Sequence, residues 1–129
     1  MSACVLVVED DDDLRLLYST YLAMRGFDVR SAADGQAAYE DALQNHPDVI
    51  LTDIAMPRLD GLELLQRVKT EKALGQLPVI VMSAYGRTRL ALAQRLGADL
   101  TIEKPLDDEE LYQAVQRVLP KSLLEPSPR

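Results

Sequence analysis

Along this chain, five short apolar runs alternate with longer segments in which apolar residues recur every three or four positions. The first and fourth runs are apolar nearly throughout, which is typical of strands that are covered on both faces in a parallel sheet. The runs that begin at Phe27 and at Leu100 are more mixed, so we expect those two strands to be less buried. The five predicted strands are Ala3–Val8, Phe27–Ser31, Val49–Thr52, Pro78–Met82 and Leu100–Glu103.

The segments between the runs show the buried stripe of amphipathic helices. Asp34, Asp60 and Asp107 stand where they can cap helix N-termini. Gly26 and Gly97 fall just after helical stretches, where glycine commonly ends a helix. The three clearest stripes are Leu14, Leu17, Tyr18, Tyr21 and Leu22; Gly61, Leu64, Leu65 and Val68; and Leu111, Val115, Val118 and Leu119.

Strand and helix alternate five times, which predicts a doubly wound α/β fold, (βα)5, with helices flanking a five-stranded parallel sheet. A length of 129 residues suits one domain with one core. We expect residues 1–119 to form that domain. Residues 120–129 contain three prolines and no periodicity, which predicts a flexible tail.

Composition excludes several classes of function. The formal net charge of −7 argues against direct nucleic-acid binding, which requires clustered Lys and Arg. No apolar stretch reaches the roughly 20 residues that span a bilayer, and the N-terminus lacks the features of a signal peptide. The single cysteine, Cys4, excludes a disulfide framework and a Cys-based metal site, and we expect it to be a small buried hydrophobe. The composition therefore favours a cytoplasmic protein without membrane contact.

Polar side chains follow four of the five predicted strands. Glu9 and Asp10 come directly after the first strand, Asp53 after the third, Ser83 after the fourth and Lys104 after the fifth. In an open parallel sheet, ligands bind at the carboxyl ends of the strands near the point where the strand order reverses. We therefore expect these groups to converge at one edge of the sheet.

The chemistry of these groups indicates a divalent ion and a phosphoryl group. Carboxylates at close range repel one another, and a bound cation relieves that repulsion. Oxygen ligands without His or Cys favour Mg²⁺, which commonly shares its coordination with a phosphate. A carboxylate such as Asp53 can then act as nucleophile toward phosphorus, while Ser83 and Lys104 hold phosphoryl oxygens.

In these residues the chain resembles the receiver domains of two-component response regulators. The resemblance covers about residues 3–119, and its four pieces occur in the family's order. They are VLVVEDD at 5–11, LTDIAMPRLDG at 51–61, VIVMSA at 79–84 and GADLTIEKP at 97–105.

The resemblance implies that Asp53 is the phosphoacceptor and that Mg²⁺ is the cofactor. Asp10 would bind the ion directly, and Glu9 would bind it directly or through water. Asp53 and the backbone carbonyl of Ala55 would complete the protein ligands. The protein would not be an enzyme beyond its own phosphorylation and dephosphorylation.

The resemblance also gives roles to the remaining groups. Ser83 would bond a phosphoryl oxygen, Lys104 would be the family's lysine, and the Lys104–Pro105 bond would be cis. The family usually has Tyr or Phe three residues before that lysine, as part of its switch, but here the residue is Thr101. We expect Ser83, Thr101 and Tyr85, a candidate substitute for the missing aromatic residue, to form the switch.

The resemblance implies partners as well. A histidine kinase or a histidine phosphotransfer protein would donate the phosphoryl group, and an unknown protein would receive the signal. We expect a single-domain regulator, monomeric or weakly homodimeric. Its output surface would comprise the helix near Gly86–Leu96, the strand near Leu100–Glu103 and the helix near Asp107–Leu119.

Two alternatives remain open at this point. Asp10 and Asp12 form an Asp-x-Asp pattern after a strand, reminiscent of haloacid-dehalogenase-type phosphatases, which would make Asp10 the nucleophile. A receiver fold that serves as an unphosphorylated interaction module is the second alternative, and Thr101 is the feature in its favour.

Overall fold

The computed structural model describes residues 2–84 and 86–120 of the chain. Five parallel strands form one sheet in the order β2-β1-β3-β4-β5. The order reverses between β1 and β3, because β2 lies on one side of β1 and all later strands lie on the other. The strands are β1 (Cys4–Val8), β2 (Asp28–Ala32), β3 (Val49–Asp53), β4 (Val79–Ser83) and β5 (Leu100–Glu103). The predicted (βα)5 fold is confirmed.

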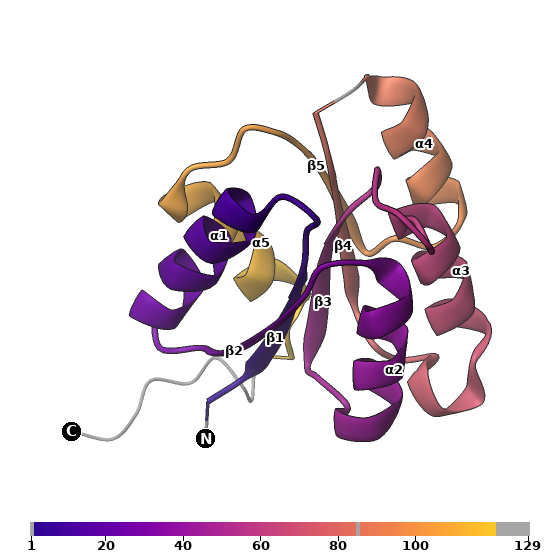
Figure 1. The fold of residues 1–129 in the computed structure, drawn as a ribbon, viewed down its shortest axis with the longest axis horizontal. Coiled ribbons are helices and arrows are strands. Elements are labelled where there is room, and N and C mark those ends of the chain that lie inside the picture. Colours follow the sequence, from indigo (N-terminus) through magenta and orange to yellow (C-terminus); the bar gives the residue numbers. More distant parts are fainter. Residues whose placement is uncertain (1, 85, 121–129) are drawn as a thin grey trace.

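Helices cover both faces of the sheet (Figure 1). One face packs against α1 (Asp12–Met24) and α5 (Asp108–Val118). The other packs against α2 (Gly35–Asn45), α3 (Gly61–Thr70) and α4 (Arg87–Arg95), and a short 3-10 helix, η1 (Lys72–Leu74), follows α3. Two separate apolar cores result, one on each side of the sheet.

Burial of the strands follows their place in the sheet. Every residue of β3 and β4 is buried, whereas β2 and β5, at the two edges, contain half-buried and exposed residues. The prediction that the second and fifth strands are less buried is confirmed. The bounds of β5 are those predicted, and the bounds of the other four strands differ from the predicted ones by a single residue at one or both ends.

The predicted helix ends are also confirmed. Asp34 accepts a hydrogen bond from the N–H of Ala37 at 2.8 Å, and Asp60 and Asp107 each form a capping box with a glutamate three residues later. Gly26 and Gly97 have φ values of 94° and 106°, left-handed values that glycine adopts readily.

Two predictions of burial are wrong. Leu17 is 40% exposed, because it lies at the margin of the α1 stripe rather than at its centre. Cys4 is only half-buried, and its Sγ accepts a hydrogen bond from Arg30 at 2.9 Å.

The predicted tail residues 121–129 and the switch candidate Tyr85 lie outside the described residues. Among the described helices, none combines the length and the apolar character that crossing a bilayer requires.

Candidate functional site

The polar residues that were predicted to converge do so at the carboxyl ends of the strands. Glu9 and Asp10 directly follow β1, and Asp53 is the last residue of β3. These two strands are neighbours at the reversal of strand order. Ser83 ends β4, and Lys104 directly follows β5. The site therefore lies where a parallel sheet of this kind binds its ligands.

Three carboxylates form a compact cluster in this site. One oxygen atom each from Glu9, Asp10 and Asp53 lies within 4.8 Å of the others. Glu9 is 1% exposed and Asp53 is 9% exposed, whereas Asp10 is exposed at the rim. Such oxygen atoms suit a hard divalent cation such as Mg²⁺, which prefers carboxylate and carbonyl ligands. The donor set thus fits the ion that the sequence predicts.

Lys104 connects the two buried carboxylates. Its Nζ lies 2.6 Å from Oε1 of Glu9 and 3.5 Å from Oδ1 of Asp53, and its side chain is 9% exposed. The N–H of Lys104 donates to the carbonyl of Ser83 at 2.9 Å, which ties the ends of β4 and β5 together. The Lys104–Pro105 bond is cis, as the resemblance implies.

Burial is the largest single influence on the pKa of Glu9, Asp53 and Lys104. Removal from water raises the pKa of Glu9, against the hydrogen bond from Lys104, and raises the pKa of Asp53, against the positive charge of Lys104. For Lys104, burial lowers the pKa, but the hydrogen bond to Glu9 and the charge of Asp53 outweigh it, so the pKa is raised. The site holds its ammonium group firmly charged while both carboxylates resist losing their protons.

A cleft of about 460 Å³ opens over this cluster. Ala55 and Ala84 line it together with Asp53, so small side chains form part of its wall. Thr101 does not reach the cleft. It pairs with Val81 in the sheet and lines a different hollow, of about 530 Å³, together with residues of α4.

Three contributors to the site were missed as functional residues at the sequence level. Arg15 donates to the backbone carbonyl of Glu9 at 2.9 Å and so holds the end of β1. Tyr18, which the sequence placed only in a helix stripe, lines the cleft. Gly61, also seen only as a stripe residue and as part of a motif, packs against the backbone of Asp53. Apolar spacing gives the buried side of a helix but not which of its residues reach the site.

Replacing Gly61 tests how tightly the loop after β3 is held. The N–H of Gly61 donates to the carbonyl of Ile54 at 2.8 Å, and a Cβ atom here would collide with the carbonyl oxygen of Asp53. We expect Gly61→Ala to lower the free energy of unfolding by about 3 kcal/mol. In urea denaturation, the matched control Gly75→Ala should be neutral or slightly stabilising, because Gly75 has helical φ and ψ and its nearest atom is 3.7 Å away. Equal stability of the two variants would contradict the close approach.

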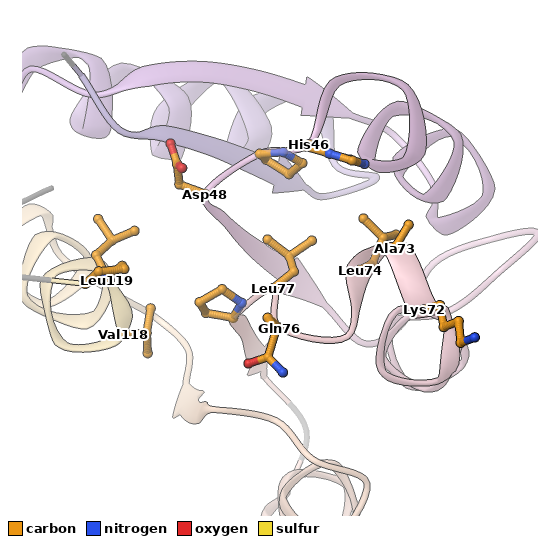
Figure 2. A pocket seen from close by; sticks show the side chains of 12 residues that line it. His46, Asp48, Lys72, Ala73, Leu74, Gln76, Leu77, Val118 and Leu119 are labelled. Atoms are coloured by element: carbon orange, nitrogen blue, oxygen red, sulfur yellow. The ribbon is translucent and has the colours of Figure 1, made fainter. Parts of the chain in front are cut away.

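A second hollow, of about 510 Å³, lies at the opposite end of the strands from the site, near the starts of β3 and β4 (Figure 2). Its walls include Leu74 and Leu77 on one side and Val118 and Leu119, at the end of α5, on the other. Asp48 is one of its polar residues, but its carboxylate already accepts a hydrogen bond from the N–H of Cys4 at 2.6 Å. No residue of the predicted site lines this hollow.

The fold and the site together define an α/β protein with an acidic, lysine-bridged cleft at the switch point of its sheet. A family model described as the response regulator receiver domain matches residues 5–116. The chain belongs to this family. Receiver domains are phosphoryl-accepting signalling modules that generally use Mg²⁺, and response regulators take their phosphoryl groups from histidine kinases.

Individual relatives agree with this assignment. The regulatory protein AtoC of Escherichia coli (strain K12) is 39% identical over 116 residues, which are 89% of this chain and 25% of AtoC. The transcriptional regulatory protein SrrA of Staphylococcus aureus (strain NCTC 8325 / PS 47) is 34% identical over 120 residues, 92% of this chain and 48% of SrrA. The chain thus spans a quarter to about half the length of these curated relatives.

Solved structures show the same fold over nearly the whole of this chain. The chemotaxis response regulator CheY4 of Vibrio cholerae has a TM-score of 0.86 and 30% identity, with 92% of this chain and 100% of that chain covered. The receiver domain of a signal transduction histidine kinase from Syntrophus aciditrophicus also has a TM-score of 0.86, with 27% identity and coverage of 99% and 98%.

Proposed function

We propose that this chain accepts a phosphoryl group on Asp53 in a reaction that depends on Mg²⁺, and that it signals by changing its contacts with proteins. The observation that supports this most strongly is the convergence of Glu9, Asp10 and Asp53 within 4.8 Å, with Lys104 between the two buried carboxylates. A histidine kinase or a histidine phosphotransfer protein would be the donor.

Asp53 is the proposed nucleophile because its buried carboxylate lines the cleft, while the other buried carboxylate, that of Glu9, is held by Lys104 at 2.6 Å. A bond would form between a carboxylate oxygen of Asp53 and phosphorus as the bond from phosphorus to the donor's histidine nitrogen breaks. Asp10, exposed at the rim, is the less suitable nucleophile, and membership of the receiver family favours Asp53 over the phosphatase alternative.

Glu9, Asp10, Asp53 and the backbone carbonyl of Ala55 are the proposed ligands of Mg²⁺. When bound, the ion neutralises the carboxylates and withdraws charge from the phosphoryl oxygens. Ser83 would donate its hydroxyl to a phosphoryl oxygen. Lys104, whose Nζ is 3.5 Å from Oδ1 of Asp53, would follow the new negative charge on the phosphoryl group.

The affinity for Mg²⁺ gives a test that depends on pH. A carboxyl group whose pKa is raised by folding stabilises the ion-free protein at low pH, and this contribution is lost as pH rises through the raised pKa. Protons therefore compete with the ion at pH values above the usual pKa range of carboxyl groups. We expect calorimetric titration to show weaker Mg²⁺ binding at about pH 5 than at neutral pH. Equal or tighter binding at the acidic pH would contradict the proposed ligands.

Output is proposed to run through the surface made by α4, β5 and α5. Thr101 stands in β5 where the family usually has an aromatic residue, so Tyr85, two residues after Ser83, is the proposed substitute.

Because Ala55 has no polar side chain to orient an attacking water, we expect a long-lived aspartyl phosphate. Tyr85→Ala should change that lifetime or the NMR spectrum of the α4-β5-α5 surface. No change in either would contradict the role of Tyr85.

The whole proposal is tested by beryllofluoride, which imitates a phosphoryl group on a carboxylate. Two-dimensional NMR should show shifts for Asp53, Ser83 and Lys104 when beryllofluoride and Mg²⁺ are both present. Beryllofluoride without Mg²⁺ should have little effect. A spectrum that is unchanged by both together would instead favour the alternative of an unphosphorylated interaction module.

A further inference from the structure

Tyr18 spans the core and the cleft. It is 2% exposed, and its ring belongs to the apolar cluster between the sheet and the helices α1 and α5, where Val7, Met82 and Leu106 are also buried. The same residue lines the cleft beside Lys104. Tyr18 is thus part of the core, and it lies close enough to the site for the charges of Lys104, Glu9 and Asp53 to act on its hydroxyl.

The hydroxyl of Tyr18 makes no hydrogen bond within the part of the chain that the structure describes, and it is not sealed from solvent either. Two other tyrosines differ in this respect. Tyr39 donates to Glu71 at 3.2 Å, and Tyr112 accepts from Gln116 at 2.8 Å. The hydroxyl of Tyr18 has no partner among the described residues and is therefore available to solvent or to a group that moves within the cleft.

Charged groups of the site act on this hydroxyl. Burial is the main cause that raises the pKa of Tyr18; Lys104 opposes the rise, and Glu9 and Asp53 add to it. Lys104 is therefore the nearby cation, and its ammonium group has three N–H donors. Glu9 at 2.6 Å and Asp53 at 3.5 Å account for two of them. The third is available to a neutral acceptor.

Lys104 needs such an acceptor when the carboxylates are otherwise engaged. In the ion-free protein, Glu9 holds the ammonium group through its short contact. A divalent ion on the carboxylates would weaken that attraction, because the ion and the ammonium group share the same negative charge. A lysine side chain is long and flexible, so it would lose its fixed position near Asp53. A phenol oxygen can restrain the ammonium group without competing for the ion.

We propose that Tyr18 is a positioning residue, whose hydroxyl accepts a hydrogen bond from Lys104 and holds the ammonium group beside Asp53 once Glu9 is engaged by the ion. This inference rests on the proposed function of Asp53. Tyr18 touches neither reacting atom and acts through Lys104 alone.

Tyr18→Phe tests the proposal, because it removes one oxygen atom and keeps the ring in the core. With acetyl phosphate and saturating Mg²⁺, we expect phosphorylation to slow about tenfold, as for loss of one hydrogen bond to a charged group. The melting temperature and the Mg²⁺ affinity should stay unchanged. In ¹⁵N NMR of the Mg²⁺-loaded protein without a phosphoryl donor, the ammonium signal of Lys104 should broaden. The matched control is Tyr21→Phe, which changes a half-buried tyrosine of the same helix that does not line the cleft.

A double-mutant cycle separates positioning from packing. On a Lys104→Met background, Tyr18→Phe should leave the affinity for beryllofluoride unchanged, whereas on the native background it should weaken that affinity. A wild-type rate and an unchanged Lys104 signal in Tyr18→Phe would overturn the proposal, as would an equal loss of affinity on both backgrounds. If the native protein itself took up neither acetyl phosphate nor beryllofluoride, the proposed function would fail instead.

Discussion

We expect Asp53→Asn to take up essentially no phosphoryl group from acetyl phosphate, a loss of roughly a thousandfold or more in rate. The substitution keeps the size and shape of the side chain but removes the nucleophilic oxygen. No other carboxylate in the cluster is placed to replace it, because Glu9 is held by Lys104 at 2.6 Å and Asp10 lies at the exposed rim. Incorporation of phosphate, measured by mass spectrometry of the intact protein, checks the expectation.

The same variant has a second expected effect, on stability. Burial raises the pKa of Asp53, so its ionised carboxylate is unfavourable in the folded, ion-free protein at neutral pH. We expect Asp53→Asn to melt at a higher temperature than the native protein without Mg²⁺, and to gain less from added Mg²⁺. The control Asp13→Asn changes an exposed aspartate in the first turn of α1. It should phosphorylate normally; a similar loss in both variants would point away from a specific nucleophile.

We expect Lys104→Met to be the most destabilising single change among the polar residues of the site, by about 3 kcal/mol at neutral pH. The methionine fills the same space, but it leaves Glu9, 1% exposed, without its ammonium partner. A buried, unpaired carboxylate costs more than the pair itself contributes, because its charge has been removed from water without compensation. Urea denaturation gives the difference in the free energy of unfolding.

The pH dependence of this loss identifies its cause. Without Lys104, the already raised pKa of Glu9 should rise further, so Glu9 becomes neutral at a higher pH. The destabilisation should therefore shrink as pH falls toward about 5. In the control Lys69→Met, the lost partner is the half-exposed Asp99 at 3.0 Å, and the loss should be about 1 kcal/mol or less. Equal losses for the two lysines at neutral pH would contradict the buried pair.

The alternation of apolar runs was sufficient to predict the fold, because a parallel sheet covered on both faces leaves a distinct pattern in the sequence. The positions of Asp53, Ser83 and Lys104 followed from the same pattern, since each stands at the end of a predicted strand. Helix caps were predictable for a similar reason: Asp60 forms its hydrogen bonds within its own turn.

Other features depend on contacts that no local pattern encodes. Lys104 and Glu9 are 95 positions apart, and their pairing became visible only when the sheet brought β5 and β1 to one edge. Leu17 matched a helix stripe but lies at its margin, where the adjacent elements decide burial. Tyr18 matched the same stripe, yet it also lines the cleft. Thr101 was identified as a departure from the family pattern, but only the fold shows that it lines a different hollow rather than the cleft.

The central claim is that Asp53, and no other carboxylate, receives the phosphoryl group. The most direct measurement is to treat the protein with acetyl phosphate and Mg²⁺, trap the acyl phosphate by borohydride reduction, and locate the modified residue by peptide mass spectrometry. We expect modification of Asp53 that disappears when Mg²⁺ is withheld. Modification of Asp10 in its place, or none at any carboxylate while Mg²⁺ is bound, would contradict it.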